Sequence, residues 1–247
     1  MNPDVRVEER RYLGEVAAIG DFLRKKKGWQ LRGERMPLAF FDNPLLVPFS
    51  QKGLQKSLLE ATLNLVKLSL ETQVPLVGYV DRSFSRDLIT MLAAFDPLLD
   101  AAEGSVYDSW LLSASGSDRL PLLNAWGDRS CYCYSKRRGL NAFNDAASGL
   151  STVGFSYLQT TANSAPARLD IPAWVYENEL LNELMDVVRA ECVIGLGYPY
   201  PLETADQSAV ISGHDREVFF RALQEFANRE KLDFSVARKD TSKARRR

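Results

Sequence analysis

Histidine and cysteine are scarce in this sequence of 247 residues. The one histidine is His214, and the three cysteines are Cys131, Cys133 and Cys192. A zinc site built from Cys and His therefore has too few ligands, and a Ser-His-Asp triad has a single candidate base. We expect Cys131 and Cys133 to pack on one strand face and His214 to lie in the first turn of a helix, so a structural role is favoured for them.

Long apolar runs and a large net charge are also absent. No apolar stretch approaches the roughly 18 residues of a membrane span, and residues 1–14 lack the apolar stretch of a signal peptide. An odd number of cysteines leaves one unpaired, which is typical of a reducing compartment. We therefore expect a cytoplasmic protein that does not associate with membranes. The formal net charge of −1 excludes a uniformly basic nucleic-acid coat.

Positive charge is instead concentrated at the C-terminal end, where six of the last ten residues are basic and one is acidic. The basic residues are Arg238, Lys239, Lys243, Arg245, Arg246 and Arg247. Such a cluster binds polyanions without defining a fold. We therefore predict a single domain over residues 1–235, followed by a flexible basic tail over residues 236–247.

Amphipathic helices alternate with short strands along the rest of the chain. Apolar residues three and four positions apart predict helices, and short alternating or continuous apolar runs predict strands. The expected helices cover residues 5–27, 52–72, 83–95, 177–192 and 215–231. The expected strands cover residues 37–41, 45–49, 74–80, 129–135, 150–159 and 167–171, and residues 195–200 should form a turn into an extended segment. This alternation predicts an α/β fold with a mixed sheet flanked by helices.

Carboxylates are the remaining candidates for chemistry, and Asp42 is the strongest of them. It follows the apolar run Leu38 to Phe41, so its side chain is expected at the end of a buried strand, where α/β sheets place ligand sites. The alternative is an aspartate that caps the following turn, because such caps are common at strand ends.

Two further acids lie in distant segments. Glu15 flanks the apolar stripe of the first helix, where a surface pair with Arg11 at four-residue spacing is the alternative. Asp206 follows the proline-containing run Tyr198 to Leu202, and a solvated loop residue is the alternative there. Glu15, Asp42 and Asp206 could converge on a hard divalent cation, since Mg²⁺ and Mn²⁺ take oxygen ligands and polarise phosphodiesters.

Four stretches of the chain, in this order, resemble the NurA nuclease family. They are Arg10 to Glu15 (RRYLGE), Phe40 to Leu45 (FFDNPL), Val74 to Val80 (VPLVGYV) and Gly197 to Ala209 (GYPYPLETADQSA). Residues 168–175 (RLDIPAWV) also resemble bacterial members. The resemblance spans residues 5–224, and it depends on the ordered set rather than on any one motif.

The resemblance implies a fold similar to ribonuclease H and a DNA nuclease that depends on Mn²⁺ or Mg²⁺, degrades 5′ ends and nicks single strands. It also implies a homodimer that acts with a HerA-type hexameric ATPase in end resection during double-strand break repair. Matched to the family pattern, Glu15 and Asp42 are catalytic metal ligands, Tyr198 lies near the scissile phosphate, and Asp206 stands where many members have a metal-binding histidine. The DNA contacts expected of the basic tail are independent of the resemblance.

Two departures from the family pattern lead to an alternative. Members usually begin with a strand bearing a Val-Asp-Gly-Ser-like motif, whose aspartate is a principal metal ligand, and this chain is expected to start downstream of that strand. Asp4 lies in a polar leader and does not replace it, while Asn43 occupies the place of a customary glycine. The alternative is a catalytically impaired NurA-like interaction module that binds an ATPase or DNA. A glycosidase built from two carboxylates ranks third, because nothing else indicates sugar binding.

Overall fold

The chain divides into two compact units, Met1–Glu203 and Thr204–Arg247, which are described separately. The structure is a computed structural model that describes residues 3–46, 55–95, 106–113, 121–135, 141–146, 148–162, 164–210 and 212–231. The basic tail predicted over residues 236–247 and the boundary predicted at residue 235 lie outside the described residues, so both stay predictions.

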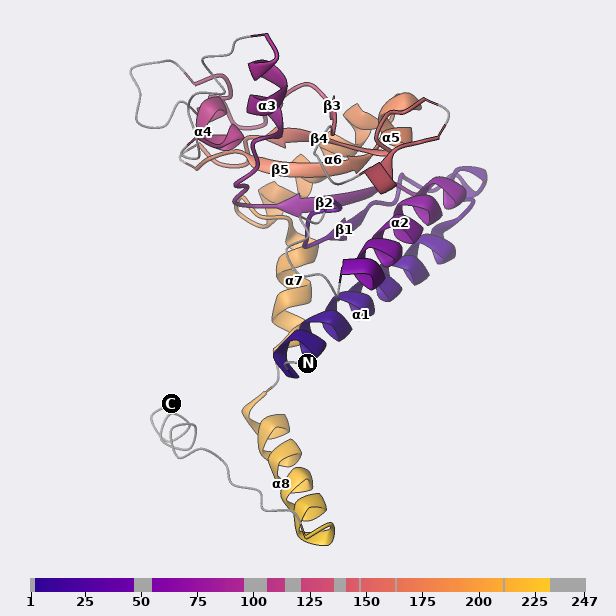
Figure 1. Ribbon diagram of the computed structural model, residues 1–247, viewed down its shortest axis with the longest axis vertical. Helices are drawn as coiled ribbons and strands as arrows, with labels where there is room; N and C mark the ends of the chain where they lie inside the picture. The colour runs from indigo at the N-terminus through magenta and orange to yellow at the C-terminus, as the bar shows by residue number, and fades with distance from the viewer. Residues whose placement is uncertain are drawn as a thin grey trace. The chain divides into compact units, whose positions relative to one another are not determined.

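The first unit is built on a five-stranded mixed sheet (Figure 1). Its strands are β1 (Ala39–Phe41), β2 (Leu76–Val80), β3 (Cys133–Tyr134), β4 (Val153–Leu158) and β5 (Ala167–Pro172). Their order is β1-β2-β5-β4-β3; β1 and β2 are parallel, and the other neighbouring pairs are antiparallel. Every residue of β4 and β5 is buried, as expected of strands covered on both faces. The predicted α/β fold with a mixed sheet flanked by helices is confirmed.

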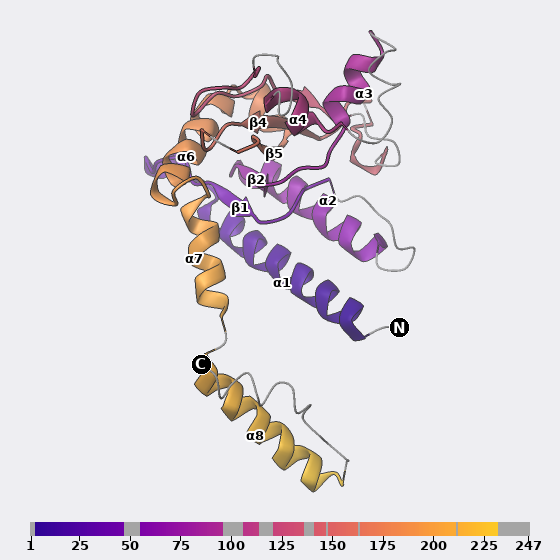
Figure 2. The same ribbon diagram turned by 90° about the vertical axis from the view of Figure 1, so that its left-hand side faces the viewer.

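Two long helices, α1 (Pro3–Lys26) and α2 (Gln55–Thr72), lie side by side beneath β1 and β2 (Figures 1 and 2). The Tyr12 hydroxyl of α1 forms a 2.6 Å hydrogen bond with the hydroxyl of Thr62 in α2. The Tyr12 ring packs edge-on against Phe41 of β1, with ring centroids 5.3 Å apart. Both helices were predicted, and these contacts dock α1 against the strand that ends at Asp42.

Shorter helices complete the first unit. They are α3 (Asp87–Ala93), α4 (Asp108–Ser113), α5 (Ala173–Glu177) and α6 (Leu181–Ile194), with 3₁₀ turns at Gln30–Arg32 and Asn141–Phe143. The apolar side of α6 is fully buried through Leu184, Met185 and Val188, in the same core as β1, β2 and β5. Burial of the bulky residues of this core supplies most of the driving force for folding.

The second unit holds the end of α7 (Tyr200–Ala209) and all of α8 (Gly213–Arg229). The Ser212 hydroxyl accepts a 3.0 Å hydrogen bond from the N–H of Asp215 and so begins α8 as an N-cap. Residues 195–197 form the predicted turn. The extended segment predicted to follow it is wrong, because α7 begins at Tyr200 and includes Asp206, which was expected in a loop. Pro201 fits there since the first turn of a helix does not need its N–H groups.

Two strand predictions also need correction. β3 has two residues rather than the seven expected over 129–135, although Arg129 still makes an isolated antiparallel bridge to Leu158. Leu45 and Leu46 are buried but do not form the expected strand over 45–49, and the last three residues of that range lie outside the described part. Among the described helices, none is both long enough and apolar enough to cross a membrane.

Candidate active site at the end of β1

Asp42 lies directly after β1 at an exposed position. Ala39 and Phe41 are buried, so β1 is anchored in the core and its C-terminal end reaches the surface. The Asp42 carboxylate accepts a hydrogen bond of 2.8 Å from the Tyr198 hydroxyl. The expected location of Asp42 at the end of a buried strand is confirmed, and its catalytic role stays a prediction.

Tyr198 reaches Asp42 from 156 residues further along the chain. Its ring packs edge-on against Tyr79 of β2, with centroids 5.2 Å apart. Gly195 and Gly197 allow the chain to return here after α6. Gly197 has a φ of +109°, and a Cβ at Gly195 would collide with the backbone oxygen of Tyr198. This glycine-containing turn therefore sets the position of the Tyr198 hydroxyl.

Glu15 approaches the same place from α1. One of its carboxylate oxygens lies 3.3 Å from the Arg11 guanidinium, which is the surface pair expected from the sequence. The other accepts a 3.2 Å hydrogen bond from the side-chain amide of Asn43, the residue after Asp42. We refer to Glu15, Asp42, Asn43 and Tyr198 as the Asp42 site. Three segments that are distant in sequence meet in it.

The turn that carries Asp42 is held by two strands of the sheet. A Cβ at Gly78 of β2 would lie 2.7 Å from the backbone oxygen of Asn43, so only glycine lets the turn lie against β2. Further along, the N–H of Leu46 donates a 3.3 Å hydrogen bond to the Asp170 carboxylate of β5. The backbone around Asp42 is thus positioned by groups that are themselves part of the core.

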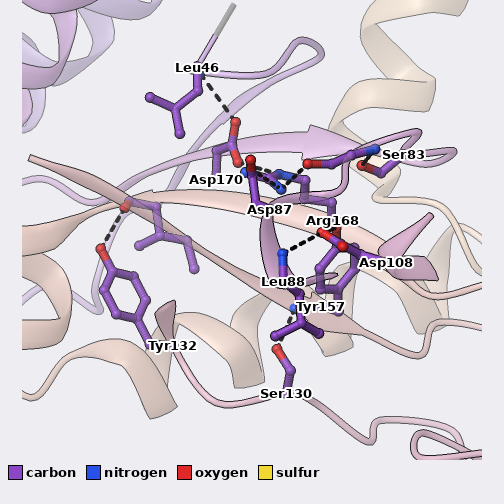
Figure 3. Close-up of polar contacts among 12 residues, drawn as sticks. Leu46, Ser83, Asp87, Leu88, Asp108, Ser130, Tyr132, Tyr157, Arg168 and Asp170 are labelled. Atoms are coloured by element: carbon purple, nitrogen blue, oxygen red, sulfur yellow. Dashed lines mark hydrogen bonds and ion pairs between the residues drawn. The ribbon is translucent and has the colours of Figure 1, made fainter. Parts of the chain in front are cut away.

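Asp170 belongs to a buried ion network shown in Figure 3. Arg168 Nε lies 2.7 Å from Asp170, and Arg168 Nη1 lies 2.8 Å from Asp87 at the start of α3. The same guanidinium donates to the Ser85 hydroxyl at 2.8 Å and lies 4.2 Å from the centre of the Phe155 ring. We call Asp87, Arg168 and Asp170 the Arg168 network. All three are buried, so each charge depends on its partners in the network.

Asp108 adds a third buried carboxylate beside the two of this network (Figure 3). It accepts hydrogen bonds from the N–H groups of Leu88 and Ile89, both at 3.0 Å, and from the Tyr157 hydroxyl at 2.9 Å. Burial raises the pKa of Asp108, and these three hydrogen bonds oppose the rise. Burial alone would lower the pKa of Arg168, but its two carboxylate partners outweigh that effect and raise the pKa.

The donor groups of the Asp42 site suit a hard divalent cation. Glu15 and Asp42 offer carboxylate oxygens, which Mn²⁺ and Mg²⁺ prefer, and both side chains are accessible from the surface. Among the residues that the structure describes, no three His, Cys, Asp or Glu side chains lie close enough together to hold a metal ion. The described part of the Asp42 site therefore supplies two carboxylates of the kind that these cations bind.

The described contacts of the Asp42 site include neither the predicted third metal ligand, Asp206, nor the predicted DNA-binding residues. Asp206 is exposed on α7 and belongs to the second unit, so its approach to Glu15 and Asp42 stays a prediction. The six basic residues of the tail, Arg238, Lys239, Lys243, Arg245, Arg246 and Arg247, lie outside the described residues.

The histidine lies where it was expected, whereas the prediction that Cys131 and Cys133 pack on one strand face is wrong for Cys131, which is exposed and precedes β3. His214 is exposed in the first turn of α8. The three cysteines are free thiols, with Cys192 buried and the sulfur atoms of Cys131 and Cys133 separated by 3.8 Å. Burial raises the pKa of Cys133 to about 12, so this thiol is a poor nucleophile at neutral pH.

The sequence-based interpretation missed the Arg168 network. Arg168 and Asp170 stand two residues apart in an otherwise apolar strand, so their side chains point to the same face. Opposite charges at that spacing in a buried strand are a signal for an internal ion pair. The participation of Asp87, which lies in a distant helix, has no comparable signal in the sequence.

Comparison with known proteins shows similarity to one protein family and to one solved structure. Residues 6–211 match the NurA domain family. No curated protein matches the chain at a significant level. The crystal structure of the NurA nuclease from Sulfolobus solfataricus is similar, with 17% sequence identity and a TM-score of 0.45. That alignment covers 78% of this chain and 51% of the other, so the chain spans about half the length of the solved nuclease.

Proposed function

The chain belongs to the NurA domain family, and from that premise we propose that it is a metal-dependent DNA nuclease. Its proposed activity combines 5′ end resection with single-strand cleavage in double-strand break repair, together with a HerA-type ATPase. The observation that supports this most is the Asp42 site, where side chains from α1, β1 and the turn after α6 meet at the end of a strand. Ligand sites in α/β sheets occupy such strand ends.

In this proposal Glu15, Asp42 and Asp206 would hold Mn²⁺ or Mg²⁺. Such a cation, when bound, would stabilise negative charge on the phosphate and lower the pKa of water. The Tyr198 hydroxyl donates a hydrogen bond to the Asp42 carboxylate and so orients it, and in this proposal it would also position the phosphate. Asn43 performs the same orienting role for Glu15, because its amide donates to that carboxylate. The protein contributes preorganised oxygen ligands on a rigid strand end.

The test is a cleavage assay on linear DNA with Mn²⁺. We expect Asp42→Ala to lower the cleavage rate by about 100-fold or more, as removal of a principal metal ligand does. The melting temperature should change little, because Asp42 is exposed. Asp21→Ala is the matched control, since Asp21 is an exposed acid on α1 in an ion pair with Arg24. Equal activity of the wild type and Asp42→Ala would remove Asp42 from the mechanism.

DNA, a HerA-type ATPase and a second copy of the chain are the proposed partners. Removal of residues 238–247 should weaken DNA binding and flatten its dependence on salt, because fewer counterions are released from the phosphates. Binding measured at several salt concentrations gives this slope. An unchanged slope would show that the basic tail does not contact DNA.

A catalytically impaired NurA-like module that binds an ATPase or DNA is the second candidate. It is favoured by the finding that no three metal-binding side chains cluster among the described residues. Calorimetry with Mn²⁺ separates the two candidates. Binding of Mn²⁺ with a rise in melting temperature supports the nuclease, and robust partner binding without Mn²⁺ binding supports the module.

A further inference from the structure

Phe84 is a large apolar side chain that the fold leaves in solvent. It lies in residues 81–86, the segment that follows β2, and it is 72% exposed. The serines on either side of it point inward: Ser83 is buried, and the hydroxyl of Ser85 accepts a hydrogen bond from the buried Arg168. Folding alone does not favour an arrangement that turns hydroxyls inward and an aromatic ring outward. The arrangement therefore indicates a role for the ring in binding.

The Phe84 ring is held in one position. The carbonyl oxygens of its two neighbours accept hydrogen bonds from the hydroxyl of Ser109, at 3.1 Å, and from the N–H of Asp108, at 2.9 Å, both at the start of α4. The ring also packs edge-on against Tyr107, with centroids 5.2 Å apart. A ring that is already fixed loses little conformational freedom when a ligand stacks on it.

The Arg168 network places this segment beside the turn that carries Asp42 (Figure 3). Asp170 accepts a hydrogen bond from the N–H of Leu46, in that turn, and Arg168 donates one to the hydroxyl of Ser85. Asp170 and Arg168 are two residues apart on β5, so they point to the same face and lie roughly 7 Å apart along the strand. The turn and the segment after β2 therefore lie over neighbouring positions on one face of the sheet.

The ends of β1 and β2 also lie side by side. The two strands are parallel, with Phe41 opposite Gly78. Asp42 therefore comes next to Tyr79, and Phe84 follows Tyr79 by five residues. Five residues span at most roughly 18 Å, so a DNA strand that passes the Asp42 site can also contact the Phe84 ring.

Arg82 adds a positive charge to the same segment. Its ion pair with Asp81 spans 4.0 Å, and the two side chains are 90% and 58% exposed, so the pair is weak in water. The guanidinium can therefore exchange this partner for a phosphate, which it binds well. Proteins that bind single-stranded nucleic acid combine such a cation, which contacts the backbone, with an aromatic ring on which a base stacks.

We propose that Arg82 and Phe84 bind an unpaired DNA strand next to the Asp42 site, with the guanidinium on a phosphate and the ring stacked on a base. This inference rests on the DNA substrate of the proposed function and adds the form in which the substrate lies at this edge of the sheet. In a duplex, neighbouring bases cover the faces of each base, so the ring selects an unpaired strand. A protein partner would need a wider apolar surface, whereas both neighbours of Phe84 are serines.

The experiment measures binding of the full-length chain to two labelled DNA strands of equal length, without Mn²⁺ or Mg²⁺ so that cleavage does not interfere. One strand is an oligothymidylate, and the other has the same backbone without bases. Fluorescence anisotropy gives the dissociation constants. Phe84→Ala should weaken binding of the oligothymidylate by about 10-fold, because one base loses its stacking partner. Its affinity for the strand without bases should equal that of the wild type.

Three further variants sharpen the test. Arg82→Ala should weaken binding of both strands by a similar factor and lower the salt slope by about 0.7, as loss of one phosphate contact does. Phe84→Trp should keep the preference for the strand with bases, because the indole also stacks. Phe95→Ala is the matched control: Phe95 is 88% exposed and follows α3, which extends away from the sheet (Figures 1 and 2). Circular dichroism shows whether each variant keeps its fold.

The outcomes separate this inference from the proposed function. Equal affinity of the wild type and Phe84→Ala for the oligothymidylate overturns the stacking site, and so does an equal loss of affinity for both strands. A wild type that binds neither strand overturns it as well. Cleavage of DNA in the presence of Mn²⁺ would leave the nuclease proposal standing in the first two cases. Binding that depends on Phe84 and on the bases supports the site even if the chain does not cleave DNA.

Discussion

The carboxylates of the Arg168 network and those of the Asp42 site lie around the same sheet but differ in burial and in their partners. Asp170 and Asp87 are buried, and the Arg168 guanidinium lies within 2.8 Å of each. Glu15 and Asp42 are accessible from the surface: Glu15 contacts the exposed Arg11 and the amide of Asn43, and Asp42 contacts the hydroxyl of Tyr198. The two buried carboxylates are paired with a cation that belongs to the protein, the Arg168 guanidinium. Those at the surface are the carboxylates to which we assign a cation from solution in the proposed function.

The two regions are connected through one turn. The N–H of Leu46, four residues after Asp42, donates to Asp170 of the Arg168 network. A buried ion network contributes little net stability over a well-packed apolar core, but breaking it leaves uncompensated charges. Here the Arg168 network holds the backbone of the turn that carries Asp42, through the hydrogen bond from Leu46 to Asp170. We therefore expect substitutions in the Arg168 network to affect mainly stability, and substitutions in the Asp42 site to affect mainly DNA cleavage.

The largest effect is expected from Arg168→Met. This change leaves Asp170 and Asp87 buried without their cation, so we expect the free energy of unfolding to fall by about 3–5 kcal/mol. Denaturant unfolding followed by circular dichroism measures it. A loss below about 1 kcal/mol would show that the Arg168 network does not support the fold.

Arg11→Met removes an exposed arginine and is compared with Arg168→Met, which removes a buried one. Arg11 pairs with Glu15 at 3.3 Å, but both side chains are accessible to solvent. Solvent-exposed helix pairs contribute only about 0.3–0.5 kcal/mol, so we expect a correspondingly small change in stability. A loss as large as that of Arg168→Met would contradict the distinction between the two regions.

Gly78→Ala is expected to have an intermediate effect. The added Cβ would lie 2.7 Å from the backbone oxygen of Asn43, so the turn that carries Asp42 must shift. We expect a loss of about 1–3 kcal/mol in unfolding free energy, in the range of other overpacking changes, and a lower rate of DNA cleavage. Gly14→Ala is the control, because nothing lies within 4 Å of its Cβ position on α1. That variant should be as stable as the wild type or slightly more stable.

Tyr198→Phe is expected to affect DNA cleavage more than stability. This variant keeps the ring contact with Tyr79 and removes only the hydrogen bond to Asp42. We expect the cleavage rate to fall by about 10-fold, because the Asp42 carboxylate loses the hydroxyl that orients it. The unfolding free energy should change by less than about 1 kcal/mol. Tyr200→Phe, at an exposed position two residues away, should leave both quantities unchanged.

The spacing of apolar residues along the chain correctly predicted most of the helices and strands that position the Asp42 site. The helices that became α1, α2, α6 and α8 were predicted because their apolar residues repeat three and four positions apart. The strand ending at Asp42 was predicted because four apolar residues precede a polar turn. The α7 helix was missed, since two prolines suggested an extended segment. Proline is compatible with a helix start, and periodicity over ten residues is too short to overrule it.

Residue order alone was enough to predict most of the secondary structure around the site, the strand end that carries Asp42 and the motifs shared with the NurA family, because these features depend on neighbours along the chain. The contacts of Tyr198 with Asp42 and of Asn43 with Glu15, and the pairing of Arg168 with both Asp87 and Asp170, became visible only in the folded chain. Hydrogen bonds and ion pairs depend on distances in space. Such distances are set by how helices and strands pack, which residue spacing does not encode.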